Sequence, residues 1–360
     1  MDWLRLLFWL GPWSDQEKSP KKIEKECIPL ERGFDLWIYN HPKRNLGTIF
    51  VIPGLHPEGP ADARLDRFCR VLANSGMRVG VPSLPTMRDV VMSEAILADS
   101  KQAFQTFLQE TGEEKVGVFS ISAASIAGIA LAIDPILSKR ISFLHTFGGF
   151  SDWSEALLFA LSGEINEGEE RLEPDPLGLP VIFLNLMESF PLFLSEMREC
   201  LIPKWKEFVA KTWEKPAMQE ECVYKEVALE LADGLRPKER IFFLKGCSVE
   251  EGGKQIVRNF LAQKNPIEWL EPERLLKRIR VPTFLSHGRD DVVVPYTQIK
   301  TLESWLQSHY CSGVFITGFY HHTGIVGWKR LLRNLVMLPT ELRHSIKMVR
   351  AIARTGGILK

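Results

Sequence analysis

The sequence lacks an excess of charge of either sign, since its 45 Lys and Arg residues balance 45 Asp and Glu residues. A nucleic-acid-binding protein needs a basic excess to meet phosphates, so this balance argues against that class of partner. The apolar N-terminus, residues 1–13, has about half of the ~20 apolar residues that cross a bilayer. With 45% hydrophobic and 25% charged residues, the 360-residue chain has the composition of a globular protein with a full core.

Cysteine and cofactor motifs are also missing. The six cysteines show neither the CxxC spacing nor the clustering of zinc sites and disulfide scaffolds. We therefore expect free thiols, a reducing compartment and a cytoplasmic location. The chain contains no HExxH, P-loop or GxGxxG motif, so we expect neither a metal nor an organic cofactor. The cysteines are Cys27, Cys69, Cys200, Cys222, Cys247 and Cys311.

The N-terminal segment, residues 1–30, does not have the features of a secretion signal. Asp2 stands where a signal peptide carries positive charge, and charged residues follow Trp13 without a small-residue cleavage site. Two interpretations of this amphipathic segment stay open. Its tryptophans and leucines suit peripheral contact with a membrane, and they equally suit a helix docked on the body of the protein.

The C-terminal segment is basic and amphipathic. Residues 329–360 contain eight basic residues and one acidic residue, Glu341. Basic side chains recur at i, i+4, i+7 and i+11, beside a face of apolar residues, which predicts a helix. Such a helix can meet anionic lipid or pack on a core with its charges in solvent, and both alternatives stay open. The basic positions are Arg343, Lys347, Arg350 and Arg354.

Seven short apolar segments rich in β-branched residues precede turn signals, and they predict buried strands. Residues 62–74 and 96–111, which lie between strands, have apolar side chains at helical spacing. This alternation predicts an α/β fold with a mostly parallel central sheet and helices on both faces. The predicted strands are Asp35–Tyr39, Thr48–Pro53, Met77–Val81, Lys115–Phe119, Ile141–Phe147, Pro282–Ser286 and Gly313–Thr317.

The alternation stops between residues 151 and 280. This stretch is rich in helix formers, carries an acidic run at 167–170 and includes a Pro- and Gly-rich passage at 173–180. We therefore expect 151–280 to be a helical cap or lid. It would be inserted into a core made by residues 31–150 and 281–360.

A serine stands where an apolar strand runs into a helix of small residues, within 115–132. In a tight strand–turn–helix elbow, a nucleophilic serine lies at the tip of the turn. Its neighbours two positions away must be small, because strand and helix nearly touch there. Ser122 has Ser120 and Ala124 in those places, so the usual G-x-S-x-G pattern is altered at both glycines. Ser122 is the candidate nucleophile.

Two later loops carry partners for a nucleophilic hydroxyl. Asp290 and Asp291 follow the sixth predicted strand, and His321 and His322 follow the seventh. A serine nucleophile needs an imidazole as general base, and the imidazole needs a carboxylate to fix its tautomer. Each of these groups lies just past the carboxyl end of a strand, where parallel sheets place their ligands.

The chain resembles the α/β-hydrolase superfamily, because the candidate serine, aspartate and histidine follow one another in that order and the serine lies at a strand–turn–helix elbow. Residues 50–59, which include Gly54, stand in the place of that family's strand and oxyanion loop, and residues 288–295 stand in the place of its acid loop. The resemblance covers residues 31–150 and 281–336. It implies that the acid is Asp291, four residues before Pro295. The base is His322 or His321, of which His322 is favoured because it begins a His-Thr-Gly turn.

The resemblance implies acyl transfer through a covalent intermediate. Ser122 would attack a carbonyl while His322 takes its proton and later delivers it to the leaving group. Backbone N–H groups of Leu55 and Ala123 would hold the oxyanion. The implied partner is a small-molecule acyl substrate, and neither a metal nor a cofactor is required.

The activity expected from these residues is that of a serine esterase, lipase or thioesterase. The apolar passage 179–194 either lines an acyl pocket, which favours a lipophilic ester or thioester, or belongs to the core. One alternative is an inactive relative that binds a ligand or a protein, because both elbow glycines are lost. Another is a serine enzyme that cleaves a peptide, lactone or carbon–carbon bond.

Overall fold

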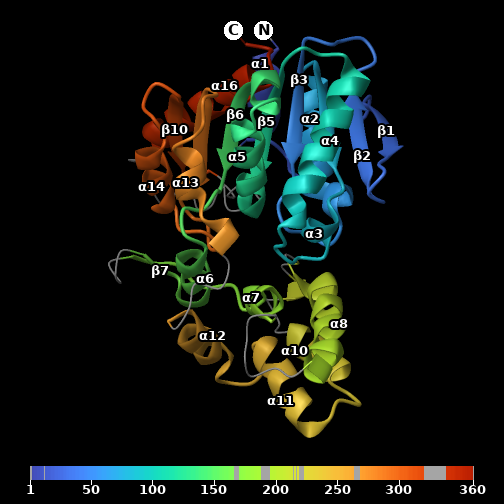
Figure 1. Ribbon diagram of the computed structural model, residues 1–360, viewed down its shortest axis with the longest axis vertical. Coiled ribbons are helices and arrows are strands. Elements are labelled where there is room, and N and C mark those ends of the chain that lie inside the picture. The colour runs from blue at the N-terminus through green and yellow to red at the C-terminus, as the bar shows by residue number, and fades with distance from the viewer. Residues whose placement is uncertain are drawn as a thin grey trace.

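The computed structural model describes residues 2–11, 13–165, 170–187, 195–213, 215, 217–218, 223–262, 268–319 and 338–359. Within these residues, the main feature is an eight-stranded sheet of order β1-β2-β4-β3-β5-β6-β9-β10 (Figure 1). Its strands are β1 (Glu24–Pro29), β2 (Asp35–Asn40), β3 (Gly47–Ile52), β4 (Met77–Pro82), β5 (Val116–Ile121), β6 (Ile141–Phe147), β9 (Thr283–Gly288) and β10 (Cys311–Thr317).

The sheet is mostly parallel, as the alternation of strands and helices predicts. Only β2 runs against its neighbours, since it pairs antiparallel with β1 and β4, and every other pair is parallel. All seven predicted strands are present, with ends that differ by at most a few residues. Strand β1 was not predicted, because its side chains are mostly exposed at the sheet edge and form no apolar run.

Helices cover both faces of the sheet, and successive residues of β3 show how. Ile49 and Val51 belong to the core cluster that includes α1 (Trp3–Leu10), α2 (Ala63–Asn74) and α16 (Leu338–Thr355). Phe50 and Ile52 point into the cluster that includes α4 (Ala95–Thr111), α5 (Ser125–Ile133) and α14 (Gln298–Trp305). The alternation follows from the two-residue period of a strand. The predicted helices at 62–74 and 96–111 are α2 and α4.

Both chain ends pack on the same face of the sheet. Leu6 and Leu10 of α1 are buried against α2 and α16, so α1 is a docked helix, as one of the two alternatives expected. The stripe of α16 that carries Val349, Ile352 and Ala353 is buried there too, while its basic stripe is exposed. Among the described residues, no helix has both the length and the apolar character that crossing a membrane requires.

The chain between β6 and β9 is helical and leaves the sheet. In Figure 1, α6, α7, α8, α10, α11 and α12 lie beyond the carboxyl ends of the strands, at the opposite end of the molecule from both termini. Their bounds are α6 (Trp153–Ser162), α7 (Gly178–Leu186), α8 (Ser195–Thr212), α10 (Val223–Leu231), α11 (Pro237–Gly246) and α12 (Gly253–Leu261), with a hairpin of β7 (Glu164–Ile165) and β8 (Glu170–Arg171). The described remainder comprises α3 (Pro85–Arg88), α13 (Pro272–Leu276), η1 (Gly59–Ala61), η2 (Ser122–Ala124), η3 (Leu137–Arg140) and η5 (Glu268–Leu270).

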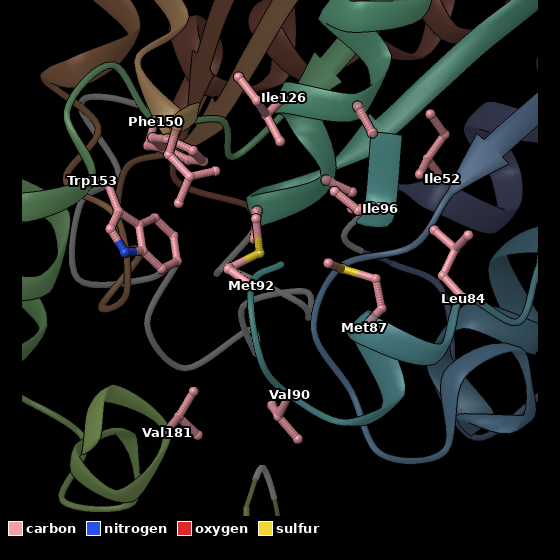
Figure 2. Packing of buried hydrophobic residues seen from close by; sticks show 14 of the residues in the cluster. Ile52, Leu84, Met87, Val90, Met92, Ile96, Ile126, Phe150, Trp153 and Val181 are labelled. Atoms are coloured by element: carbon pink, nitrogen blue, oxygen red, sulfur yellow. The ribbon is translucent and has the colours of Figure 1, made fainter. Parts of the chain in front are cut away.

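These helices share a core with the sheet. Figure 2 shows Met87, Met92 and Ile96 from the sheet side together with Trp153 of α6 and Val181 of α7. The first half of the apolar passage 179–194 forms α7 and is buried, whereas residues 188–194 lie outside the described residues. Helix α13 packs on α5 and α14, so this short helix belongs with the sheet's own layer.

Candidate active site

Ser122 lies at the sharp turn between β5 and α5. Strand β5 ends at Ile121, and Ser122 opens the 3-10 turn η2 that leads into the helix. Its φ is +54°, a conformation that residues other than glycine rarely adopt. Strain of this kind persists only where the surroundings enforce it, and it is common at functional sites. The sequence placed Ser122 at the tip of a strained elbow, and the backbone has that conformation.

The small residues around Ser122 allow strand and helix to approach each other. Ser120 and Ala124 are fully buried. A Cβ added to Gly128 of α5 would lie only 2.7 Å from the Oγ and 2.9 Å from the Cβ of Ser120. The crowding that the elbow pattern predicts is therefore present, although the glycine that relieves it is Gly128 and not a neighbour of the nucleophile.

The loop after β3 lies against this elbow. A Cβ added to Gly54 would lie 3.3 Å from both the carbonyl oxygen of Ile121 and the Cβ of Ser122. Leu55 follows, and within the described chain no hydrogen bond is made by its N–H. Ala123 is in the first turn of η2, where backbone N–H groups lack acceptors inside the helix. Leu55 and Ala123 line the same cavity as Ser122.

Asp291 is fully buried in the loop after β9. Its Oδ1 accepts hydrogen bonds from the N–H groups of Val293, at 2.8 Å, and Val294, at 2.9 Å. Asp291 is not itself a lining residue, but Val292, Val293 and Val294 of its loop line the cavity. The carboxylate is thus held rigidly at the edge of the site that contains Ser122, at the carboxyl end of its strand.

His287, to which the sequence patterns assign no role, is a partner of Asp291. It is fully buried on β9, and its Nε2 lies 3.0 Å from the carbonyl oxygen of Val294 and 3.3 Å from Oδ2 of Asp291. A carbonyl oxygen only accepts, so Nε2 carries the proton and donates to this pair of oxygens. One imidazole therefore ties the strand, the acid and the loop together. The signal available in the sequence was the spacing of four residues between His287 and Asp291.

The predicted base lies outside the described residues. His321 and His322 both fall in 320–337, so neither can be placed relative to Ser122, and the choice between them stays a prediction. Strand β10, which leads to this loop, ends at Thr317 beside β9, in the position that the prediction requires.

A cavity of about 520 Å³ contains the site. Its walls come from the sheet, from α2, from α16 and from the helices between β6 and β9, and most of the lining side chains are apolar. A volume of this size is within the range that binds small organic ligands. Gly54, Leu55 and His56, from the loop after β3, are also among the lining residues.

One group of side chains near the site has the composition of a metal site. Ligand atoms of His56, Glu58 and Asp62 lie within 4.8 Å of one another. Both ring nitrogens of His56 are engaged, however, because Nδ1 accepts the N–H of Glu58 and Nε2 lies 3.4 Å from Asp62. Burial raises the pKa of Asp62, but hydrogen bonds and charge from Arg64 outweigh burial and leave that pKa below its ordinary value. These contacts account for the cluster without an ion.

Comparison with known proteins identifies the fold. No protein-family model and no curated protein sequence matches the chain. Among solved structures, a Legionella pneumophila protein assigned as a hydrolase is 13% identical with a TM-score of 0.50, covering 92% of this chain and 88% of its own. The chain has the fold of the α/β-hydrolase superfamily. The mostly parallel eight-stranded sheet with helices on both faces is the architecture of the α/β-hydrolase fold.

Two further structures give lower scores. Pyrococcus horikoshii acylaminoacyl peptidase is 11% identical with a TM-score of 0.49, over 94% of this chain and 42% of the peptidase. A Pyrococcus furiosus esterase is 11% identical with a TM-score of 0.46, over 93% of this chain and 91% of the esterase. The chain therefore spans about two fifths of the length of the peptidase. At these identities the likeness concerns the α/β-hydrolase fold and not an activity.

Proposed function

We propose that this protein is a serine hydrolase that cleaves a carboxylic ester or thioester of a lipophilic acid. Ser122 is the nucleophile, Asp291 is the acid, and His322 is the base, with His321 as the alternative. The helices between β6 and β9 act as a cap over the site. The observation that carries the proposal is the left-handed backbone of Ser122 at the carboxyl end of β5, in a largely apolar cavity.

The proposed reaction has two steps. In the first, Oγ of Ser122 bonds to the acyl carbon, the histidine takes the hydroxyl proton, and the carbon–oxygen or carbon–sulfur bond breaks as that proton passes to the leaving group. In the second, the histidine takes a proton from water, the hydroxide bonds to the acyl carbon, and the bond to Oγ of Ser122 breaks as the histidine returns that proton to Oγ, which releases the acid. Each tetrahedral intermediate carries an oxyanion, which the N–H groups of Leu55 and Ala123 stabilise.

Two features support this assignment beyond Ser122. The contact between Gly54 and the elbow puts the loop that carries Leu55 beside the nucleophile, as an oxyanion hole requires. The solved structure that shares this fold with a TM-score of 0.50 is assigned as a hydrolase, which agrees with the proposal. Ester and thioester substrates fit better than peptides because the lining of the cavity is largely apolar.

Covalent labelling with a fluorophosphonate probe tests the proposal. The wild type should label as Ser122 displaces fluoride from phosphorus, and Ser122→Ala should lose both labelling and hydrolysis of p-nitrophenyl butyrate. Ser125→Ala is a matched control, because Ser125 is a buried serine three residues further along. Comparing His321→Ala with His322→Ala then identifies the base, whose loss should lower kcat by at least about a thousandfold.

An absence of labelling in folded wild-type protein would contradict the proposal. The protein would then be a binding module on an α/β-hydrolase fold. Labelling that persists in Ser122→Ala and disappears in Ser125→Ala would assign the nucleophile to Ser125 and contradict the assignment to Ser122.

A further inference from the structure

The residues that line the cavity with Ser122 fall into two groups, one on the helices between β6 and β9 and one on the face of the sheet that α2 and α16 cover. The outer lobe lies among the helices between β6 and β9, and the inner lobe lies between α2 and α16. The outer lobe is lined by Trp153, Leu157, Val181, Ile182 and Trp213, all in the core cluster of the α4 and α5 face. The inner lobe is lined by Phe68, Phe119, Phe147, Met348 and Ile352, on the face that α1, α2 and α16 cover.

We propose that the inner lobe binds the acyl chain of the substrate, which leaves the outer lobe to the leaving group. This assignment rests on the proposed function and adds the direction in which the substrate lies. The inner lobe follows β5 back from the nucleophile, from Ile121 to Phe119, so a chain bonded to Ser122 can run along the strand. Three aromatic rings and two aliphatic side chains of α16 make its walls apolar.

The two arginines that line the inner lobe do not require an anionic ligand, because their partners are within the protein. Arg67 is 7% exposed, and its guanidinium donates to the carbonyl oxygens of Lys18, at 2.8 Å, and Trp9, at 3.0 Å. Arg64 pairs with Asp62 at 3.0 Å. Arg67 thereby fastens the chain that follows α1 over α2, and Leu10, Gln16 and Glu17 of that stretch complete the wall of the cavity.

The proposal predicts how rate depends on chain length. Each buried methylene strengthens binding by roughly fourfold at most, so kcat/KM should rise with acyl length until the lobe is full. A panel of p-nitrophenyl esters from acetate to palmitate measures this in the wild type and in Ile352→Trp, which fills the inner lobe. The ratio of kcat/KM for laurate over acetate should fall at least tenfold. Phe68→Trp, at a half-buried site on α2, provides a second test if Ile352→Trp folds poorly.

Val181→Trp is the matched control, because it places the same indole ring in the outer lobe. It should change the preference among leaving groups, measured with a series of alcohols on one acid, and leave the laurate-to-acetate ratio within about threefold of the wild type. The proposal is overturned if Val181→Trp shortens the preferred chain and neither inner-lobe variant does.

A failure of the proposed function can be told apart from a failure of this inference. If the wild type neither labels nor hydrolyses any ester, the hydrolase proposal fails, and palmitate binding by calorimetry still tests the inner lobe. Weaker palmitate binding in Ile352→Trp, with unchanged binding in Val181→Trp, would support the lobe. The reverse pattern, or no binding by the wild type, would overturn it.

A second and independent observation concerns the outer surface of α1. Leu4 and Phe8, one helical turn apart, are 45% and 63% exposed, and Trp13 is 42% exposed. The indole Nε1 of Trp13 donates to the backbone carbonyl oxygen of Phe8 at 3.0 Å, which holds the Trp13 ring at the end of α1. Three large apolar side chains thus form one exposed patch, which we name the α1 patch.

Basic side chains lie beside the α1 patch. Arg343, Lys347, Arg350 and Arg354 form the exposed stripe of α16, and the guanidinium of Arg350 lies 5.3 Å from the ring centre of Trp3 on α1. Two acidic side chains near the patch are paired with basic ones, since Asp2 lies 3.2 Å from Arg44 and Asp15 lies 3.1 Å from Lys18. We infer that the α1 patch and this basic stripe dock together on an anionic lipid bilayer, the apolar side chains in the interface and the stripe on the headgroups.

Sedimentation with vesicles tests this surface. The wild type should bind vesicles of phosphatidylcholine with 30% phosphatidylserine more tightly than vesicles of phosphatidylcholine alone, and 0.5 M NaCl should weaken that binding. Phe8→Asp and Lys347→Glu should each lower binding to the anionic vesicles at least fivefold. Ile136→Asp, at a 73% exposed site on the face of the sheet that α5 covers, should bind as the wild type does.

Equal binding by wild type, Phe8→Asp and Ile136→Asp would overturn the docking surface, and so would no binding by the wild type. A wild-type dimer that Phe8→Asp converts to a monomer would assign the α1 patch to a second copy of the chain instead. Sedimentation velocity on the same proteins distinguishes that outcome.

Discussion

At the scale of single residues, the site depends on the close approach of Gly54 to Ser122. A methyl group at position 54 would come within 3.3 Å of Ser122 Cβ and of the Ile121 carbonyl oxygen, so the loop or the elbow must shift by a few tenths of an ångström. Because oxyanion stabilisation depends on donor position to that precision, such a shift acts on the transition state more than on substrate binding.

Gly54→Ala should therefore lower kcat for p-nitrophenyl butyrate by about tenfold with little change in KM. Steady-state kinetics measures the two parameters, and a thermal melt within a few degrees of the wild type shows that the fold persists. A change confined to KM would mean that Gly54 shapes the binding cavity and not the oxyanion site.

His287 is the second residue whose effect can be separated from folding. Without its Nε2–H, the acid loop loses a donor shared by Asp291 and Val294, so the carboxylate is less firmly oriented toward the base. His287→Ala should lower kcat/KM by about 10- to 100-fold. In the pH profile of kcat/KM, the limb at low pH should move to lower pH, because a less well oriented Asp291 carboxylate stabilises the charged form of the histidine base less.

The matched control for His287 is His145, which is equally buried on the neighbouring strand β6. His145→Gln should leave the acid limb of the profile where it is in the wild type. His287→Gln, which keeps a side-chain donor, should recover part of the lost rate. A profile that His287→Ala leaves unshifted would reduce His287 to a packing residue.

At the scale of elements, one side chain joins the helices between β6 and β9 to the sheet. Asn185 of α7 donates to the carbonyl oxygen of Val90 at 2.9 Å and accepts the N–H of Met92 at 2.7 Å. Val90 has φ +57°, which is strained for a β-branched residue, so the loop after α3 needs such support. The two elements lie almost a hundred residues apart in the chain, and Asn185 also lines the cavity.

Asn185→Ala should lower the free energy of unfolding by about 1–3 kcal/mol, since it leaves buried backbone groups without partners. Urea denaturation measures the loss. Asn259→Ala on α12 is the control, because Asn259 is exposed and should cost less than about 0.5 kcal/mol. Equal stability of the two variants would show that α7 is held to the sheet by apolar packing alone.

At the scale of the whole molecule, stability should depend on pH through His145. This residue is fully buried between the rings of Phe119 and Phe284, and burial lowers its pKa from 6.5 to about 3. Between these two values the unfolded chain binds a proton that the folded chain does not. Acidification therefore favours unfolding, and the stability is fully present only above about pH 6.5.

Between pH 7 and pH 5, His145 should lower the free energy of unfolding by about 2 kcal/mol. The measurement is the urea denaturation midpoint across this range for the wild type and for His145→Gln, which should show a flatter dependence by about that amount. His309→Gln, at an exposed site, is the control and should follow the wild type. If the denaturation midpoint depends on pH equally in the wild type and in His145→Gln, the proton taken up on unfolding binds to a group other than His145.

Much of the fold could be predicted because the residues that make it are neighbours in the chain. Seven strands, α2 and α4 each have an apolar period visible in a short window, and the elbow at Ser122 is a local pattern of small residues. Strand β1 was missed because an edge strand with mostly exposed side chains carries no such period. The roles of His287 and Gly128 were missed because each depends on which atom lies opposite it.

The sequence by itself determined the order of the elements, the chemical types of the candidate site residues and the small side chains that let Ser122 take a positive φ. The tertiary structure decided which residues from distant parts of the chain lie next to one another. The cavity is lined by α2, α7 and α16, from three distant parts of the chain, and its inner lobe lies on a face of the sheet while its outer lobe lies among the helices between β6 and β9. No local period encodes such a space, because its shape depends on how the helices pack and not on any one of them.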